Sequence, residues 1–411
     1  MNPLLPENCY MPDAEARVMP DGRLYLYGSW DISNENGYCS QVLHCFSTDD
    51  MENWVDHGVI FRNDEEFYGI DWNRKTRLFA PDCIEKNGKY YLYVCGNFRE
   101  EGVAVADSPA GPFSAAERIE IADGDSIDPA VFVDTDGQGY LFWGQFILRG
   151  AKLTPDMKKI IPESVKTNIL TEWEHGFHEG SSIRRRGDKY YMVYTDISRG
   201  KATCLSYAIS NSPLGPYRKM GVIIDNIYCD PETWNNHGSI AEYKGQWYVF
   251  YHRSSCNSRY CRRVCAEPIY FDENGLIHEV EQTSQGSSVA LNPLLPIRAR
   301  YACRVMGNCH INREGNKEVL TACGDGHWGM PDWAEYKYID FGKADISKFK
   351  VLVKGKGTIT IKIDGGTAIS SVKNENEDYA WVSAPCDNID GIHPLWLFLD
   401  GEISVDEFVF E

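Results

Sequence analysis

Five ionisable side chains stand at nearly the same distance before five glycine-centred turns, and their types suit acid–base chemistry. They are Asp13, Asp82, Asp128, Glu179 and His237. A single aspartate at such a place is typical of a turn, but Glu and His are poor turn formers, so five in register indicate a shared site. Carboxylates that cluster repel one another, which raises the pKa of at least one of them. A protonated acid beside an ionised base is what glycosidic cleavage requires.

The elements that must position these side chains are five repeated segments of one plan. Each begins with glycine and has a tyrosine three residues later: GRLYLYGSW from Gly22, GKYYLYVCG from Gly88, GQGYLFWGQ from Gly137, GDKYYMVYT from Gly187 and GQWYVFYHR from Gly245. A turn glycine between two alternating apolar runs predicts a β-hairpin. The spacing of the segments, about 50–66 residues, is typical of one four-stranded propeller blade.

We therefore predict an all-β protein whose first domain, residues 1–285, is a five-bladed β-propeller. A β-sandwich is the competing fold, but it does not explain five matched hairpins. The first strand of each propeller blade lines the central channel, so the five ionisable residues would meet at one mouth of it. We interpret Asp82 as a structural residue behind that site.

The composition limits the partners of this 411-residue chain. A formal net charge of −19 disfavours nucleic acid and anionic membrane surfaces and leaves neutral substrates open. Aromatic residues make up 13 % of the chain, which is typical of β-strands and also suits stacking against sugar rings. The length predicts two domains.

Cysteine usage and the N-terminal residues predict a cytoplasmic location. The 14 cysteines include no CxxC pair and show no regular framework. The opening residues, MNPLLPENCY, lack a basic segment followed by an apolar run, and no apolar stretch approaches the length of a membrane span. A reducing compartment fits these features.

The motifs around the ionisable residues resemble glycoside hydrolase family 43, a family of five-bladed propellers. The matching segments are MPDAEARV, FAPD, SIDPAVFVDTDG, FHEGSSIRRRGDKYY and NNHGSIAEYKGQWYVFYHR, in family order. The resemblance implies that Asp13 is the general base that activates water, Glu179 the general acid, and Asp128 the third carboxylate, which keeps Glu179 protonated and orients it. It also implies inversion at the anomeric carbon, with no cofactor required.

The same resemblance implies substrate-binding residues. His237 corresponds to a family histidine near the channel floor, where a structural Ca²⁺ or a water cluster is held in some members. Arg262 resembles an arginine that reaches the sugar; its neighbour Arg263 must point to the other face of the strand. Three tryptophans are candidate stacking platforms, with the middle one best placed, and packing in the core of a blade is the alternative role for each: Trp72, Trp143 and Trp234.

The second domain is predicted over residues 299–411, after a linker at 283–298 that is rich in Ser, Gly and Pro. Short alternating runs such as TITIKIDGG and LWLFLDG predict a small β-sandwich. The pattern resembles family 6 carbohydrate-binding modules, with Trp381 as a candidate binding aromatic. The asparagine that such modules place before the final strand is missing from ISVDEF, so bracing the propeller is the alternative role.

These features predict a glycosidase that removes terminal α-L-arabinofuranose, β-D-xylose or both from plant-type oligosaccharides. An endo-arabinanase of the same fold is one alternative, since the shape of the groove is not readable from sequence. A non-catalytic sugar-binding propeller is another, although it would be expected to lack one of the three carboxylates. The expected partner is a carbohydrate, with neither nucleic acid nor membrane.

Overall fold

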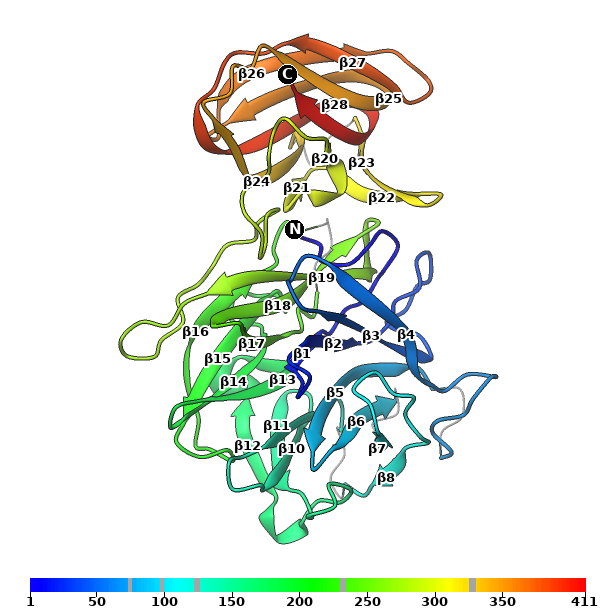
Figure 1. The fold of residues 1–411 in the computed structure, drawn as a ribbon, viewed down its shortest axis with the longest axis vertical. Helices are drawn as coiled ribbons and strands as arrows, with labels where there is room; N and C mark the ends of the chain where they lie inside the picture. The colour runs from blue at the N-terminus through cyan, green and yellow to red at the C-terminus, as the bar shows by residue number, and fades with distance from the viewer. Residues whose placement is uncertain (73–75, 97–99, 122–125, 230–233, 325–329) are drawn as a thin grey trace.

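The protein is described by a computed structural model covering residues 1–72, 76–96, 100–121, 126–229, 234–324 and 330–411 (Figure 1). Five small antiparallel sheets form a β-propeller, and a curled sheet of nine strands follows it. Among the described residues the only α-helix is α1 (Glu172–His175), beside two short 3₁₀ turns. No helix in these ranges is long and apolar enough to cross a membrane.

The blades follow one another along the chain, each with its strands in sequence order. Their strands are β1 (Glu15–Val18), β2 (Leu24–Gly28), β3 (Val42–Thr48) and β4 (Trp54–Arg62); β5 (Leu78–Lys86), β6 (Lys89–Gly96), β7 (Glu101–Ala106) and β8 (Glu117–Ile119); β9 (Ala130–Val133), β10 (Gly139–Trp143), β11 (Ile147–Lys152) and β12 (Lys166–Thr171); β13 (Phe177–Arg186), β14 (Lys189–Asp196), β15 (Cys204–Ser210) and β16 (Arg218–Asp225); and β17 (Ser239–Tyr243), β18 (Gln246–Ser255) and β19 (Ser258–Ile269).

The five predicted hairpins are confirmed, and each joins the first two strands of a blade. Their turn glycines all have positive φ, between +61° and +83°, with open space where a Cβ would stand. That backbone conformation is cheap only for glycine, which explains why the same residue opens every repeat.

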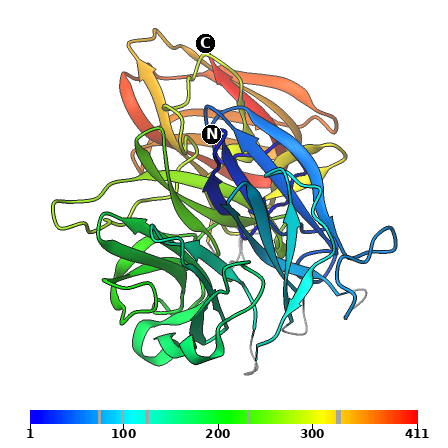
Figure 2. The ribbon, with the colours of Figure 1, turned by 60° about the horizontal axis from the view of Figure 1, so that its bottom comes forward.

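The propeller ring closes between its first and last blades, where the blue β1 lies beside the green β17 (Figures 1 and 2). The N-terminal residues run along the outer side of β19. The backbone N–H of Leu4 donates to the carbonyl of Val264 at 3.0 Å, and the Asn2 side chain exchanges hydrogen bonds with Ala266. The start of the chain therefore completes the three-stranded fifth blade.

A buried ionic network fills the channel below the site and ties four blades together. Arg17 of β1 donates to Asp82 of β5 at 3.0 Å, and Asp82 also accepts the backbone N–H of Val131 at 2.7 Å. Glu15 pairs with Arg184 of β13. Asp82 thus acts as a structural residue, as expected from the sequence.

The second unit is the smaller β domain that was predicted, built as a curled sheet of nine strands. Its strands are β20 (Ile297–Arg298), β21 (Arg304–Met306), β22 (His310–Glu314), β23 (Lys317–Cys323), β24 (Asp332–Gly342), β25 (Lys348–Ile363), β26 (Thr367–Asn374), β27 (Ala380–Pro385) and β28 (Gly391–Phe410). The two long strands, β25 and β28, pair along most of their length and enclose one apolar core. Trp381 is 44 % exposed on β27; sugar binding there stays a prediction.

The two units meet through buried ion pairs as well as through the segment 283–298. Glu318 of β23 accepts from Arg263 of the propeller at 3.2 Å and from Arg300 at 2.6 Å. Thr283, at the start of the segment, donates to Glu267 of β19 at 2.7 Å.

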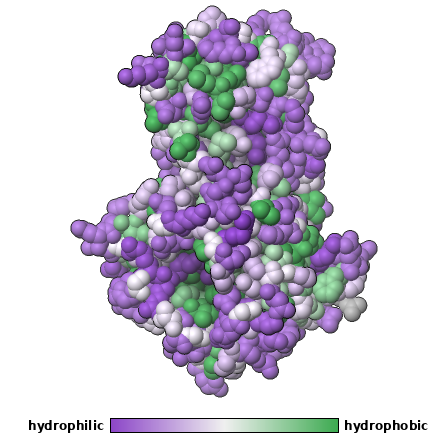
Figure 3. Space-filling view, in the orientation of Figure 1, coloured by the Kyte–Doolittle hydropathy of each residue, from purple (hydrophilic) through white to green (hydrophobic). Residues whose placement is uncertain are grey.

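The face of the molecule in Figure 3 is mostly hydrophilic over both units, with small hydrophobic patches. The predicted boundaries at 285 and 299 stay a proposal.

Candidate active site

One cavity of about 190 Å³ at the propeller axis gathers most of the residues predicted from the sequence. It is lined by Asp13, Tyr38, Cys39, Phe79, Ile127, Asp128, Gln145, His178, Glu179, Trp234, Asn235, His237 and Arg262. All three predicted carboxylates are there, contributed by blades one, three and four. Four of the five residues that precede the repeated hairpins therefore meet, and only Asp82 lies below them.

The backbone presents the carboxylates through unusual conformations. Asp13 and Asp128 each stand just before the first strand of a blade, with φ of +58° and +56°, a left-handed region that aspartate tolerates better than most residues. Glu179 lies inside β13, where the register to β14 shifts on both sides of it. These bends turn the side chains toward the channel.

Gly180 makes room for the site directly after Glu179. Its φ is +66°, and a Cβ there would stand 2.9 Å from Cγ of His237 and 2.9 Å from the Thr195 hydroxyl. Its backbone N–H is hydrogen bonded to Asp128. Glycine is thus needed for both conformation and space.

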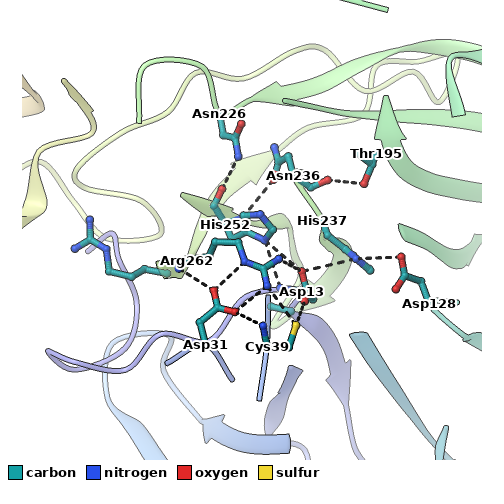
Figure 4. A network of polar contacts seen from close by, with 12 residues as sticks. Asp13, Asp31, Cys39, Asp128, Thr195, Asn226, Asn236, His237, His252 and Arg262 are labelled. Carbon is teal, nitrogen blue, oxygen red and sulfur yellow. Dashed lines mark hydrogen bonds and ion pairs between the residues drawn. The ribbon is translucent and has the colours of Figure 1, made fainter. Parts of the chain in front are cut away.

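Asp13 is surrounded by cationic or polar nitrogens (Figure 4). Nη1 of Arg262 lies 2.9 Å from Oδ1, with Nδ1 of His252 at 3.6 Å and Nδ1 of His237 at 3.9 Å. Burial alone would raise the pKa of Asp13, but Arg262 together with the two histidines outweighs it and holds the pKa below its ordinary value. Asp13 is therefore ionised and able to accept a proton.

Arg262 is held in place by a second buried aspartate, Asp31, which follows β2. Nε and Nη2 of Arg262 donate to the two oxygens of Asp31 at 2.8 and 2.9 Å, and the Arg262 backbone N–H donates at 3.0 Å. Asp31 also accepts the backbone N–H of Cys39 at 3.0 Å. The bidentate fork leaves Nη1 free to face Asp13.

Asp128 has the opposite electrostatic environment. Burial, the negative charge of Glu179 and that of Asp13 raise its pKa well above the ordinary value, partly offset by the N–H of Gly180. Nδ1 of His237 lies 3.9 Å from Oδ2. Asp128 thus retains a proton at a pH where an isolated aspartate has lost it.

Glu179 is contacted by a residue that the sequence analysis did not single out. Nε2 of Gln145, the last residue of the third repeated segment, donates to Oε2 of Glu179 at 2.7 Å. An aromatic wall stands beside it: the His178 ring meets Phe146 edge-on at 5.2 Å and Trp234 at 5.9 Å. A donor beside a carboxylate is invisible in sequence when the two residues lie on different blades.

Tyr38 also lines the cavity and was not predicted from the sequence. The Arg262 guanidinium stands 4.9 Å from the Tyr38 ring centre, and Tyr260 packs edge-on against that ring at 4.7 Å. No repeat or motif marks Tyr38, because it lies in the loop between β2 and β3. Loop residues such as this one reach the site only through the tertiary fold.

The predicted role as a stacking platform is wrong for two of the three tryptophans. Trp143 is 1 % exposed and packs in an apolar cluster with Val131 and Leu141, because its position in β10 turns the ring into the interface between blades. Trp72 packs against the core of the first two blades and closely approaches Gly102. Neither lines the cavity, whereas Trp234 and Arg262 do.

His237 lines the cavity, but the residues present do not form a protein-ligated calcium site. Ca²⁺ takes six to eight oxygen ligands, whereas the histidine offers one ring nitrogen facing two carboxylates. Within the described ranges, no cluster of three or more His, Cys, Asp or Glu is arranged to hold a metal. We therefore derive no step of the chemistry through a metal ion.

Comparisons with known proteins agree with this geometry. Residues 3–277 match the family model of glycosyl hydrolases family 43. A xylosidase/arabinosidase of Thermoclostridium stercorarium is 31 % identical, over 98 % of this chain and 96 % of its own length. Xylosidase/arabinosidase 43A of Humicola insolens is 32 % identical, over 67 % of this chain and 98 % of its own length.

Solved structures share the fold. A β-xylosidase/α-arabinofuranosidase from a compost metagenome, in a calcium-free complex with xylotriose, is 28 % identical with a TM-score of 0.58, covering 68 % of this chain and 97 % of its own. An arabinoxylan arabinofuranohydrolase of Bacillus subtilis, 23 % identical with a TM-score of 0.58, covers 100 % of this chain and 97 % of its own. The second likeness concerns the fold alone and extends over both units.

Proposed function

This chain belongs to glycosyl hydrolases family 43 and is a glycosidase, and we propose that it releases terminal α-L-arabinofuranose, β-D-xylose or both from plant-type oligosaccharides, with inversion. The observation that carries the proposal is the single cavity where Asp13, Asp128 and Glu179 meet beside Arg262. The xylosidase and arabinosidase names of the relatives support a pentose as the sugar released.

The proposed roles follow from the different environments of the carboxylates. Asp13, kept ionised by Arg262, accepts a proton from the attacking water. Glu179 donates a proton to the leaving oxygen, and Asp128, the third carboxylate of the cavity, orients it. Inversion needs room for a water between base and sugar, with carboxyl groups roughly 6.5–9.5 Å apart.

Action at chain ends is supported by the size of the cavity. About 190 Å³ is less than the roughly 300–1,000 Å³ of pockets for drug-sized ligands, and fits one sugar unit better than a stretch of polymer. An endo-arabinanase would need a groove open at both ends.

Cofactor use and location complete the proposal. Acid–base hydrolysis on these side chains needs no cofactor. A structural Ca²⁺ would be supported by a fall in Tm after chelation, reversed by added calcium. All fourteen cysteines lie in the described ranges, where they form no disulfide bond, and this supports the proposed cytoplasmic location.

Hydrolysis of nitrophenyl α-L-arabinofuranoside and β-D-xyloside by the wild type, Asp13→Ala and Glu179→Ala tests the proposal. Asp13→Ala should lose several orders of magnitude on the preferred glycoside. Glu179→Ala should lose less, because nitrophenolate leaves with little acid help. Proton NMR of the first-formed anomer tests inversion. Full activity of Asp13→Ala would contradict the assigned base, and activity only on internal bonds of arabinan would favour the endo enzyme.

A further inference from the structure

We propose that Gln145 is a positioning residue for the general acid: it fixes one oxygen of Glu179 and so determines which oxygen delivers the proton. The inference rests on the proposed role of Glu179. It starts from the 2.7 Å hydrogen bond that Nε2 of Gln145 donates to Oε2. Oε1 has no hydrogen-bond partner among the described residues, and Glu179 lines the cavity.

The turn that carries Gln145 is hydrogen bonded to the backbone beside Asp128 and beside Glu179. The N–H of Gly144 donates to the carbonyl of Ile127, next to Asp128, at 3.0 Å, and the N–H of Phe146 donates to the carbonyl of His178, next to Glu179, at 2.8 Å. Gly144 has φ of +127°, and a Cβ there would stand 2.3 Å from the carbonyl oxygen of Ile147. The amide is therefore held in one place relative to blades three and four.

The chemistry gives this hydrogen bond a specific effect. An oxygen that accepts an amide N–H is a poor place for a proton, so the acidic proton resides on Oε1. As the glycosidic C–O bond breaks, its electron pair goes to the leaving oxygen, which takes the proton from Oε1, while water adds to the anomeric carbon and gives its proton to Asp13. Glu179 becomes a carboxylate, and the amide bond to Oε2 strengthens because the acceptor is now charged. Gln145 thus stabilises the transition state more than the bound substrate.

A leaving-group series tests the inference. For wild type and Gln145→Met, which keeps the size but loses the donor, kcat/KM is measured on dinitrophenyl, nitrophenyl and methyl glycosides and on the natural disaccharide. General acid catalysis contributes roughly 10²–10⁴-fold. We expect Gln145→Met to lose about 10- to 100-fold on the methyl glycoside and disaccharide, and about twofold or less on the dinitrophenyl glycoside, which needs no protonation.

Two controls make the result specific. Gln138→Met removes an amide donor of the same blade that bonds only the carbonyls of Gly139 and Leu153, and it should match wild type on every substrate. In the Glu179→Ala background, Gln145→Met should cause no further loss on the methyl glycoside. If Gln145→Met does not fold, Gln145→Asn, which keeps the amide but loses reach, takes its place with the same expected pattern.

The results of the leaving-group series distinguish failure of the Gln145 role from failure of the proposed function. An equal loss on all leaving groups, no loss at all, or additive losses with Glu179→Ala would overturn the role of Gln145 while leaving the glycosidase mechanism intact. A wild type that cleaves none of these glycosides would overturn the proposed function itself, and the inference with it.

Discussion

Nη1 of Arg262 donates a 2.9 Å hydrogen bond to Oδ1 of Asp13, and both side chains are almost fully buried. The next residue, Arg263, points the other way and pairs with Glu318 of the second unit at 3.2 Å. Alternation along one strand, β19, thus sends one guanidinium to the base and the next to the interface between the units.

Replacing Arg262 should move the acidic limb of the pH–activity profile. Arg262→Met removes the main cation that lowers the pKa of Asp13, so the carboxylate takes up a proton at higher pH and activity is lost there. The acidic limb of kcat/KM against pH should shift upward. Arg185→Met, which removes an arginine paired with Asp134 outside the cavity, should leave that limb unchanged. An unmoved limb in Arg262→Met would show that Asp13 is not the group that titrates.

Asp128→Asn should lower activity while raising stability at neutral pH. The folded-state pKa of Asp128 lies well above the ordinary value, so its contribution to stability is complete at low pH and is lost as pH rises through the folded pKa. Asparagine keeps an acceptor for the Gly180 N–H and has no charge, so no stability is lost through ionisation of this side chain at neutral pH. We expect a Tm that is higher near pH 8 and similar at low pH, with kcat reduced by about two orders of magnitude. A lower Tm at pH 8 would contradict the repulsion.

Gly180→Ala should damage the site beyond its backbone cost. Left-handed backbone costs a residue with a Cβ about 1–2 kcal/mol, and here the new Cβ would also press on His237. Gly187→Ala is the matched control, since φ is +61° there against +66° and the space is open. Thermal unfolding should show a larger loss for Gly180→Ala, and only that variant should lose kcat/KM. Equal effects on activity would remove the spatial argument.

The two tryptophans Trp143 and Trp234 should separate stability from binding. Trp143→Ala leaves a cavity in the apolar cluster between two blades and should lower the free energy of unfolding by about 3–5 kcal/mol. Trp234 lines the cavity, so Trp234→Ala should raise KM with only a small change in Tm. Chemical denaturation and steady-state kinetics on the same preparations check both. A raised KM with unchanged stability for Trp143→Ala would restore its predicted role as a platform.

Glu318→Gln should weaken the junction of the two units. It leaves the guanidinium groups of Arg263 and Arg300 without their buried partner, a loss of about 3–5 kcal/mol. Burial would raise the pKa of Glu318, but the two arginines hold it below its ordinary value. Its stabilisation is thus present above the unfolded-state pKa and lost as pH falls through the folded pKa. Glu375→Gln, which removes a surface pair with Lys373, should leave Tm unchanged at any pH.

The five hairpins were readable from sequence because a turn glycine and alternating strands are local features. The convergence of ionisable residues followed from them, since a repeated position in repeated blades must recur around one axis. The choice of Asp13, Asp128 and Glu179 as the catalytic carboxylates came from the resemblance to family 43. The alternation of Arg262 and Arg263 was readable for the same reason: side-chain direction along a strand has a period of two.

Only the tertiary structure decided what meets those residues. Gln145 reaches Glu179 and Asp31 fixes Arg262 across blade boundaries, and no local pattern records such contacts. Trp143 was predicted to face the site but lies in the core between two blades. Successive side chains of a strand point to opposite faces, so a change of one position decides between the two. Sequence thus determined the repeats and the carboxylates, while ring closure and strand register determined their partners, since both depend on how distant segments pack.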